Sequence, residues 1–232
     1  DRKKGVFGRV NAGYGSHDRY EGSASFNTFR DNTQLSILGG ANNINRQGYS
    51  FNDLISSMGG MSSFQGNRGG GNRGGPGASG GNGNTNSWST GINFRDVWGP
   101  KLQVSGNYFV SKSSNTNQSK SYRQNFFPND SVAFADEISY RKNVNVNHRI
   151  GLRIEYEIDS MNSLLITPNI NIQLSESQSL DSLITRATSP KFNYTAITGN
   201  LDRSNNRDGL SLGNNLLFRH PFHKPGRTFT IG

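Results

Sequence analysis

The sequence contains no cysteine, which excludes a disulfide framework, a thiolate metal site and a cysteine nucleophile. It is also poor in hydrophobic residues, which make up 31% of its 232 residues and leave the mean hydropathy at -0.70. No apolar run approaches the roughly 20 residues that a membrane-spanning helix requires. A large soluble hydrophobic core is therefore hard to build from this composition.

Charge does not account for the shortage of hydrophobic residues, because charged residues make up only 18% of the chain. The rest of the polar content is mainly Asn, Ser, Gly and Thr, and the aromatic content of 10% argues against wholesale disorder. The net charge of +9 raises the question of a nucleic-acid partner. The basic residues are scattered and form no block of like charge, so we expect no such partner.

Alternation with a period of two is the dominant pattern, and it is clearest over residues 143–158. The even positions carry Val144, Val146, His148, Ile150, Leu152, Ile154, Tyr156 and Ile158, and the odd positions carry Asn143, Asn145, Asn147, Arg149, Gly151, Arg153, Glu155 and Glu157. Successive side chains of a strand point to opposite faces, so one face is apolar and the other is polar or small. The alternation outlasts a typical soluble strand of about five or six residues.

The pattern resumes after turn residues 159–163 and predicts a hairpin. Leu164, Ile166, Pro168, Ile170, Ile172 and Leu174 share one face, opposed by Leu165, Thr167, Asn169, Asn171 and Gln173. Pro168 is the weak point, because proline cannot donate to a strand ladder. Shorter alternating runs occur near residues 6–14, 20–27, 35–41, 88–94, 102–110 and 210–218, and a truncated strand follows.

The connections between these strands alternate in length. Short ones fall near residues 30–33, 96–101, 159–163 and 220–226, and long ones span 43–87, 112–142 and 176–208. An outer-membrane barrel has short turns at one rim and long loops at the other. The sequence therefore predicts an all-β fold, an antiparallel up-and-down transmembrane β-barrel of which about nine strands are visible, with long polar outer loops. A soluble β-sandwich is the alternative, since its strands alternate too.

A barrel assigns the two strand faces to lipid and to the lumen. The expected lipid-facing residues are Ile150, Leu152, Ile154, Tyr156 and Ile158, and the expected lumen-facing residues are Arg149, Arg153, Glu155, Glu157, Asn169, Asn171 and Gln173. Aromatic residues near strand ends would form interfacial girdles. The lumen-facing set is interpreted either as a contact surface for a plug or a solute, or as a ladder of cross-strand ion pairs and hydrogen bonds.

A glycine-rich segment lies within the longest connection, and we expect a flexible loop over about residues 66–87. Two arginines among its glycines suggest RNA binding, but no aromatic residue falls between Phe64 and Trp88, so the loop interpretation is favoured. His220 and His223 have loose metal-ligand spacing without a third ligand, and Asp130, Asp136 and Glu137 lack the spacing of a calcium loop. We therefore expect no metal, no cofactor and no enzyme activity.

Four runs carry a resemblance to a known family: "KKGVFGRVNAGYGSHDRYEGSASFNTFRDNTQLSILGGANNINRQGYSFNDL", "GINFRDVWGPKLQVSGNYFVSKS", "NHRIGLRIEYEIDSMNSLLITP" and "NNLLFRHPFHKPGRTFTI". They resemble the barrel of TonB-dependent-receptor-like outer-membrane proteins of the Bacteroidota. The resemblance implies a cell-outer-membrane location, lipid contact and uptake of an unknown ligand. Residues 1–232 would be part of a single barrel domain of a longer protein, with a plug and coupling to TonB supplied by parts outside this segment.

The sequence departs from the family pattern in two respects. It contains no plug and no TonB box, and about nine strands do not match the even number usual in single-chain barrels. Two other functions therefore stay open. One is an outer-membrane barrel without transport, serving as an adhesin or as an assembly or secretion partner, and the other is a soluble all-β binding module.

Overall fold

The computed structural model describes residues 4–46, 48–51, 53, 83–128, 130–222 and 227–232. These residues form nine strands, which are β1 (Lys4–Gly15), β2 (Arg19–Arg30), β3 (Thr33–Asn42), β4 (Asn84–Trp98), β5 (Leu102–Phe127), β6 (Ser131–Asp159), β7 (Asn162–Ser189), β8 (Phe192–Pro221) and β9 (Thr228–Ile231).

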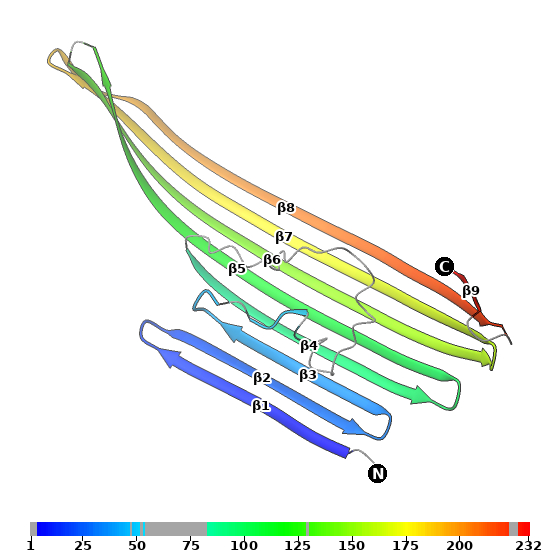
Figure 1. The fold of residues 1–232 in the computed structure, drawn as a ribbon. Coiled ribbons are helices and arrows are strands. Elements are labelled where there is room, and N and C mark those ends of the chain that lie inside the picture. The colour runs from blue at the N-terminus through cyan, green and yellow to red at the C-terminus, as the bar shows by residue number, and fades with distance from the viewer. Residues whose placement is uncertain (1–3, 47, 52, 54–82, 129, 223–226) are drawn as a thin grey trace.

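All nine strands belong to one antiparallel sheet in which each strand pairs with its neighbours in the sequence. Figure 1 shows them side by side from β1 to β9. The predicted all-β, up-and-down arrangement is thus confirmed. The sheet is open over the described residues, with β1 and β9 at the two ends of the strand order.

The expected long polar loops over residues 112–142 and 176–208 are wrong, because most of both segments is strand. β5 and β6 stay paired from Leu102 and Tyr156 out to Phe127 and Ser131, and β7 and β8 pair in the same way to their tip. These parts project well beyond β1–β4 (Figure 1). In β5, residues 113–121 are polar on both faces, so no alternation marks them as strand, and their ladder is set by pairing with neighbouring strands. In β6, by contrast, Val132, Phe134, Ile138 and Tyr140 share one face, an alternation that the sequence interpretation missed.

The short connections fall where the sequence places them, at the rim opposite the projecting hairpins. β2 and β3 are joined at residues 31–32, β4 and β5 at 99–101, and β6 and β7 at 160–161. Residues 66–82 of the expected glycine-rich loop lie outside the described residues. Asn84–Ser87 belong to β4 and pair with β5, so the predicted end of that loop at residue 87 is wrong.

The two faces of the sheet differ in an unusual way. Most of the buried residues are polar. In the described part of the chain, only Leu38, Phe109 and Val110 are buried hydrophobic residues. Ile92 and Asn93 illustrate the contrast, because consecutive residues of β4 point to opposite faces and are 41% and 1% exposed, respectively. We call the side of Ile92 the apolar face and the side of Asn93 the polar face.

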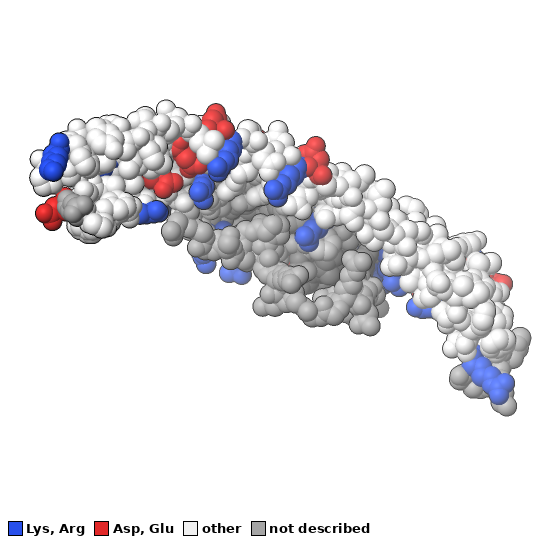
Figure 2. Space-filling view, turned by 90° about the horizontal axis from the view of Figure 1, so that it is seen from above, with Lys and Arg blue, Asp and Glu red and all other residues white. Residues whose placement is uncertain are grey.

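The sheet is curved rather than flat, as expected from the twist of β-strands. Figure 2 shows it as an arc with a mostly uncharged surface. Basic and acidic side chains appear there in small groups of both signs, without one large patch of like charge on the side in view. This agrees with the scattered charges of the sequence.

Candidate functional site

An apolar belt covers the middle of the apolar face. Its residues are Trp88, Ile92, Phe94, Trp98, Leu102, Val104, Tyr108, Val110, Val146, Ile150, Leu152, Ile154, Tyr156, Leu164, Ile166, Ile170, Ile172, Leu174, Leu210, Leu212, Leu216 and Phe218. On β6 and β7 the belt covers residues 146–156 and 164–174. A tilted transmembrane strand needs about 9–11 residues, so the height of the belt fits a bilayer.

Four of the expected lipid-facing residues, Ile150, Leu152, Ile154 and Tyr156, lie on this apolar face, whereas Ile158 falls at a register irregularity between Glu157 and Asp159. Ile150 stands opposite Tyr108 and Ile170 in the cross-strand register, and Leu152, Tyr156 and Ile158 are exposed large hydrophobic residues. The alternation in the sequence alone is therefore enough to predict that the four residues share a face.

The belt has a distinct end on each side. Trp98, Leu102, Tyr156, Leu164 and Phe218 form one cross-strand row at the end near the short turns. The row at the other end contains Trp88, Lys112, Val146, Leu174 and Asp208, and so includes two charged side chains. Near the first end, Asp96 of β4 also lies on the apolar face, opposite Val104, and accepts a hydrogen bond from Trp98 Nε1. Aromatic residues at both ends of an apolar belt are typical of the interfacial regions of a barrel.

The expected lumen-facing residues lie on the polar face. Arg149 is opposite Asn171, Gly151 is opposite Asn169, and Asn147 is opposite Gln173. The expected ladder of cross-strand ion pairs differs from the structure. Arg153 and Glu155 form an ion pair of 3.0 Å along β6 itself, because their side chains are two residues apart on the same face.

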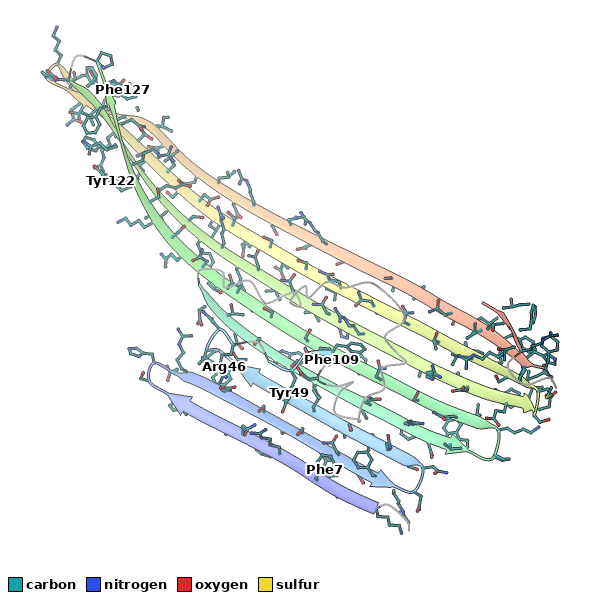
Figure 3. All side chains as sticks on the ribbon, in the orientation of Figure 1. Phe7, Arg46, Tyr49, Phe109, Tyr122 and Phe127 are labelled. Atoms are coloured by element: carbon teal, nitrogen blue, oxygen red, sulfur yellow. The ribbon has the colours of Figure 1, made fainter. Side chains whose placement is uncertain are left out.

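An aromatic cluster on the polar face was missed by the sequence interpretation. Leu38 and Phe109 break the polar pattern of β3 and β5, and Tyr49 and Phe51 pack against them. Figure 3 shows Tyr49 and Phe109 close to each other near the middle of the sheet. The sequence does contain a signal for this cluster, because Leu38 and Phe109 are apolar at positions where the alternation predicts polar residues.

A second feature of the polar face is a shallow hollow of about 370 Å³ near β1 and β2. Arg46 forms an ion pair of 2.8 Å with Glu21 at its border, and Arg9, Asn11 and Ser23 also line it. The hollow is open and its ion pair is exposed, so water would stay in contact with a ligand there and the charges would contribute little to binding.

Two asparagines tie the segment after β3 to its neighbours, Asn45 to the start of β4 and Asn43 to the start of β2. Asn45 donates from Nδ2 to the carbonyl oxygen of Gly83 at 2.8 Å and accepts from the backbone N–H of Thr85 at 2.7 Å. Asn43 accepts from the backbone N–H of Tyr20 at 2.7 Å and donates to the carbonyl oxygen of Asp18. The bonds of Asn45 therefore bring the two ends of the long connection to one place on the rim.

The described metal candidates form no ligand cluster. His220 Nδ1 lies 2.8 Å from Asn162 Oδ1, whereas His223 falls outside the described residues. Asp136 and Glu137 are consecutive in β6 and so point to opposite faces. Within the described ranges, no group of three or more His, Asp or Glu side chains is arranged to hold a metal ion.

None of the described segments is a helix long and apolar enough to cross a membrane. The chain matches no protein-family model, no curated protein and no solved structure.

Proposed function

We propose that this sheet is part of the wall of an outer-membrane β-barrel that acts as a receptor and transporter for a ligand. The observation that carries the proposal is the inverted distribution of polarity. A bilayer-high belt of large apolar side chains lies on one face and includes ten exposed residues, among them Trp98 and Leu212, whereas the polar face holds every buried residue of the described chain except Val110. Lipid would cover the belt, and the polar face would line the lumen.

The size of the belt supports lipid as the covering partner. Monomeric soluble proteins rarely expose contiguous apolar patches larger than a few hundred Å². The belt runs continuously across β4–β8, five strands about 4.8 Å apart, and is as high as a bilayer core. In lipid, the free backbone groups of β1 would also need partners, so further strands would close the sheet.

The projecting parts of β5–β8 would make first contact with the ligand. Residues 131–143 of β6 alone would reach about 40 Å beyond the belt, at roughly 3.3 Å per residue. The proposal that uptake is energised rests on the resemblance to TonB-dependent-receptor-like proteins. By the same resemblance, a plug domain and TonB are the proposed partners. The polar face would then contact the plug and the passing ligand.

A second function is favoured by the tip of the β5–β6 hairpin. Tyr122, Phe126 and Phe127 are 60%, 76% and 55% exposed there. Figure 3 places Tyr122 and Phe127 at the far end of this hairpin. Exposed aromatic residues at a distal tip suit an adhesin or an assembly partner, because aromatic side chains are enriched at protein interfaces. A soluble all-β binding module would instead leave the belt in water.

Shortening both hairpins in the full-length protein tests these functions. Asn117, Arg141, Ser179 and Arg203 lie in one cross-strand row, so deleting 118–140 and 180–202 and inserting Asn-Gly turns would leave a paired edge. We expect the shortened protein to stay in the outer membrane and cells to lose uptake of a nutrient. Unchanged uptake across a broad nutrient screen, with lost adhesion or assembly, would favour the second function. A protein that folds without detergent would contradict both.

A further inference from the structure

The segment after β3 turns back onto the polar face. Asn42 Nδ2 donates to the carbonyl oxygen of Arg46 at 3.1 Å, and Ser89 Oγ donates to the carbonyl oxygen of Tyr49 at 3.0 Å. Both donors are side chains of the sheet, so they hold the backbone of residues 46 and 49 along the polar face. Phe51 follows within reach of β5 and β6.

Phe51 lies between an aromatic ring and a guanidinium group. Its ring meets that of Phe109 edge-to-face, with centroids 6.2 Å apart and an angle of 72° between the planes. The guanidinium carbon of Arg149 lies 5.7 Å from the centroid of the Phe51 ring. Gly91 pairs with both Leu38 and Phe109, so no side chain separates these two buried residues.

Among the described residues, Arg149 forms no ion pair with an acidic side chain. Its cross-strand neighbours are Phe109 and Asn171, and Asn147 and Gly151 flank it on the same face of β6. Two carboxylates that could compete are engaged by other groups among the described residues. Glu155 pairs with Arg153, and Asp53 accepts hydrogen bonds from the backbone N–H and the hydroxyl of Ser50, each at 2.7 Å.

A guanidinium that contacts an aromatic face keeps N–H donors in its plane for a second partner. An anion can therefore reach Arg149 without displacing it from Phe51. Phe109 and Phe51 offer ring surfaces beside that charge, and planar apolar groups stack or pack edge-to-face on such rings.

We propose that Phe51, Phe109 and Arg149 form a binding site for an organic anion with a flat apolar group. The acidic group of the ligand pairs with Arg149, and its flat part packs against the two rings. The inference rests on the proposed function in one respect, since the polar face must line a lumen that solutes enter. The site deepens that function by naming the chemical class of solute.

Cysteine labelling of the full-length protein in cells tests the charge of the site. Residues 1–232 contribute no native cysteine, and any cysteine elsewhere in the longer protein is first replaced by serine. Asn171→Cys, which stands opposite Arg149 in the register and leaves all three site residues in place, is treated with an anionic and a cationic methanethiosulfonate reagent of similar size. We expect faster labelling by the anionic reagent, loss of that preference with Arg149→Gln, and its return with Arg149→Lys. Ser204→Cys on the projecting part of β8 is the matched control, and its rate ratio should not respond to Arg149→Gln.

Competition tests the apolar part of the ligand. We expect 2-naphthoate to slow labelling of the cysteine at position 171 more than acetate does at the same concentration. Equal protection by the two acids, no labelling by either reagent, or a rate ratio that ignores Arg149→Gln would each overturn the site. Absence of the protein from the outer membrane would contradict the proposed function instead, and the same labelling of the purified protein would then test the site alone.

Discussion

The carboxamide of Asn107 lies over Gly151, the residue opposite it on the neighbouring strand. A Cβ atom at position 151 would come within 2.9 Å of Asn107 Oδ1. The same relationship recurs two strands further on, where a Cβ at Gly213 would lie 2.7 Å from Asn169 Oδ1. In both pairs, glycine on one strand provides the space that the asparagine of the next strand fills.

We expect Gly151→Val to lower the free energy of unfolding by about 1–3 kcal/mol, the usual cost of overpacking. The cost arises because the buried Asn107 side chain must move. Urea unfolding in detergent micelles measures it, and Asn107→Ala provides the matched background. In that background the cost of Gly151→Val should fall, since the clash is relieved. Strictly additive effects of the two changes would show that the contact does not limit position 151.

The apolar belt leads to a second prediction, on Leu152 and Arg153. Leu152 is 41% exposed on the apolar face, whereas the Arg153 side chain is 15% exposed on the polar face. Leu152→Arg should block membrane insertion, because an arginine facing lipid at the midplane costs about 2–4 kcal/mol. Arg153→Leu should insert normally. Cell fractionation and heat-modifiability on gels measure both, and identical behaviour would mean that the faces are assigned wrongly.

Asn45 provides a third prediction, at the rim. Its backbone has a positive φ of 57°, a conformation that costs most residues roughly 1–2 kcal/mol. Asn45→Ala should lose both side-chain hydrogen bonds and strain the backbone, whereas Asn45→Gly should lose only the bonds, at about 0.5–1.5 kcal/mol each. Chemical unfolding should therefore rank the native protein first, glycine second and alanine last. If Asn45→Ala and Asn45→Gly lower the free energy of unfolding equally, backbone strain at position 45 does not contribute.

The turn between β6 and β7 gives a fourth prediction, on pH dependence. Hydrogen bonds from the Asn162 side chain, at 2.8 and 2.9 Å, and from the backbone N–H of Met161 hold the pKa of Asp159 below its usual value of 3.8. Because the folded pKa is the lower one, ionised Asp159 stabilises the fold. This stabilisation is complete above the usual pKa and is lost as the pH falls through the folded value.

We therefore expect Asp159→Asn to lower the unfolding midpoint at neutral pH and to matter less as the pH falls below about 4. Asn162→Ala removes the main cause of the lowered pKa and should reduce the same pH dependence while leaving the carboxyl in place. Urea midpoints of the three proteins over this pH range measure the effect. A constant gap between the native protein and Asp159→Asn would argue against a titrating Asp159.

Alternation was enough to predict the strands of the belt and their faces. The residues around Leu152 alternate because successive side chains lie on the apolar face and on the polar face in turn. The sequence therefore alternates between apolar residues and polar or small ones. The projecting part of β5 around Gln118 carries no such pattern. Both of its faces are polar, so its residues fit a loop or a strand equally well until neighbouring strands pair with it.

The sequence by itself therefore determined the all-β class, the apolar and polar faces, and the rim of short turns, because these depend on residues close together in the chain. Only the tertiary structure decided the length of the projecting hairpins and the position of Phe51 between Phe109 and Arg149. Those features depend on register and on contacts between residues that are far apart in sequence. Such contacts are set by the packing of the whole sheet, and local pattern does not encode them.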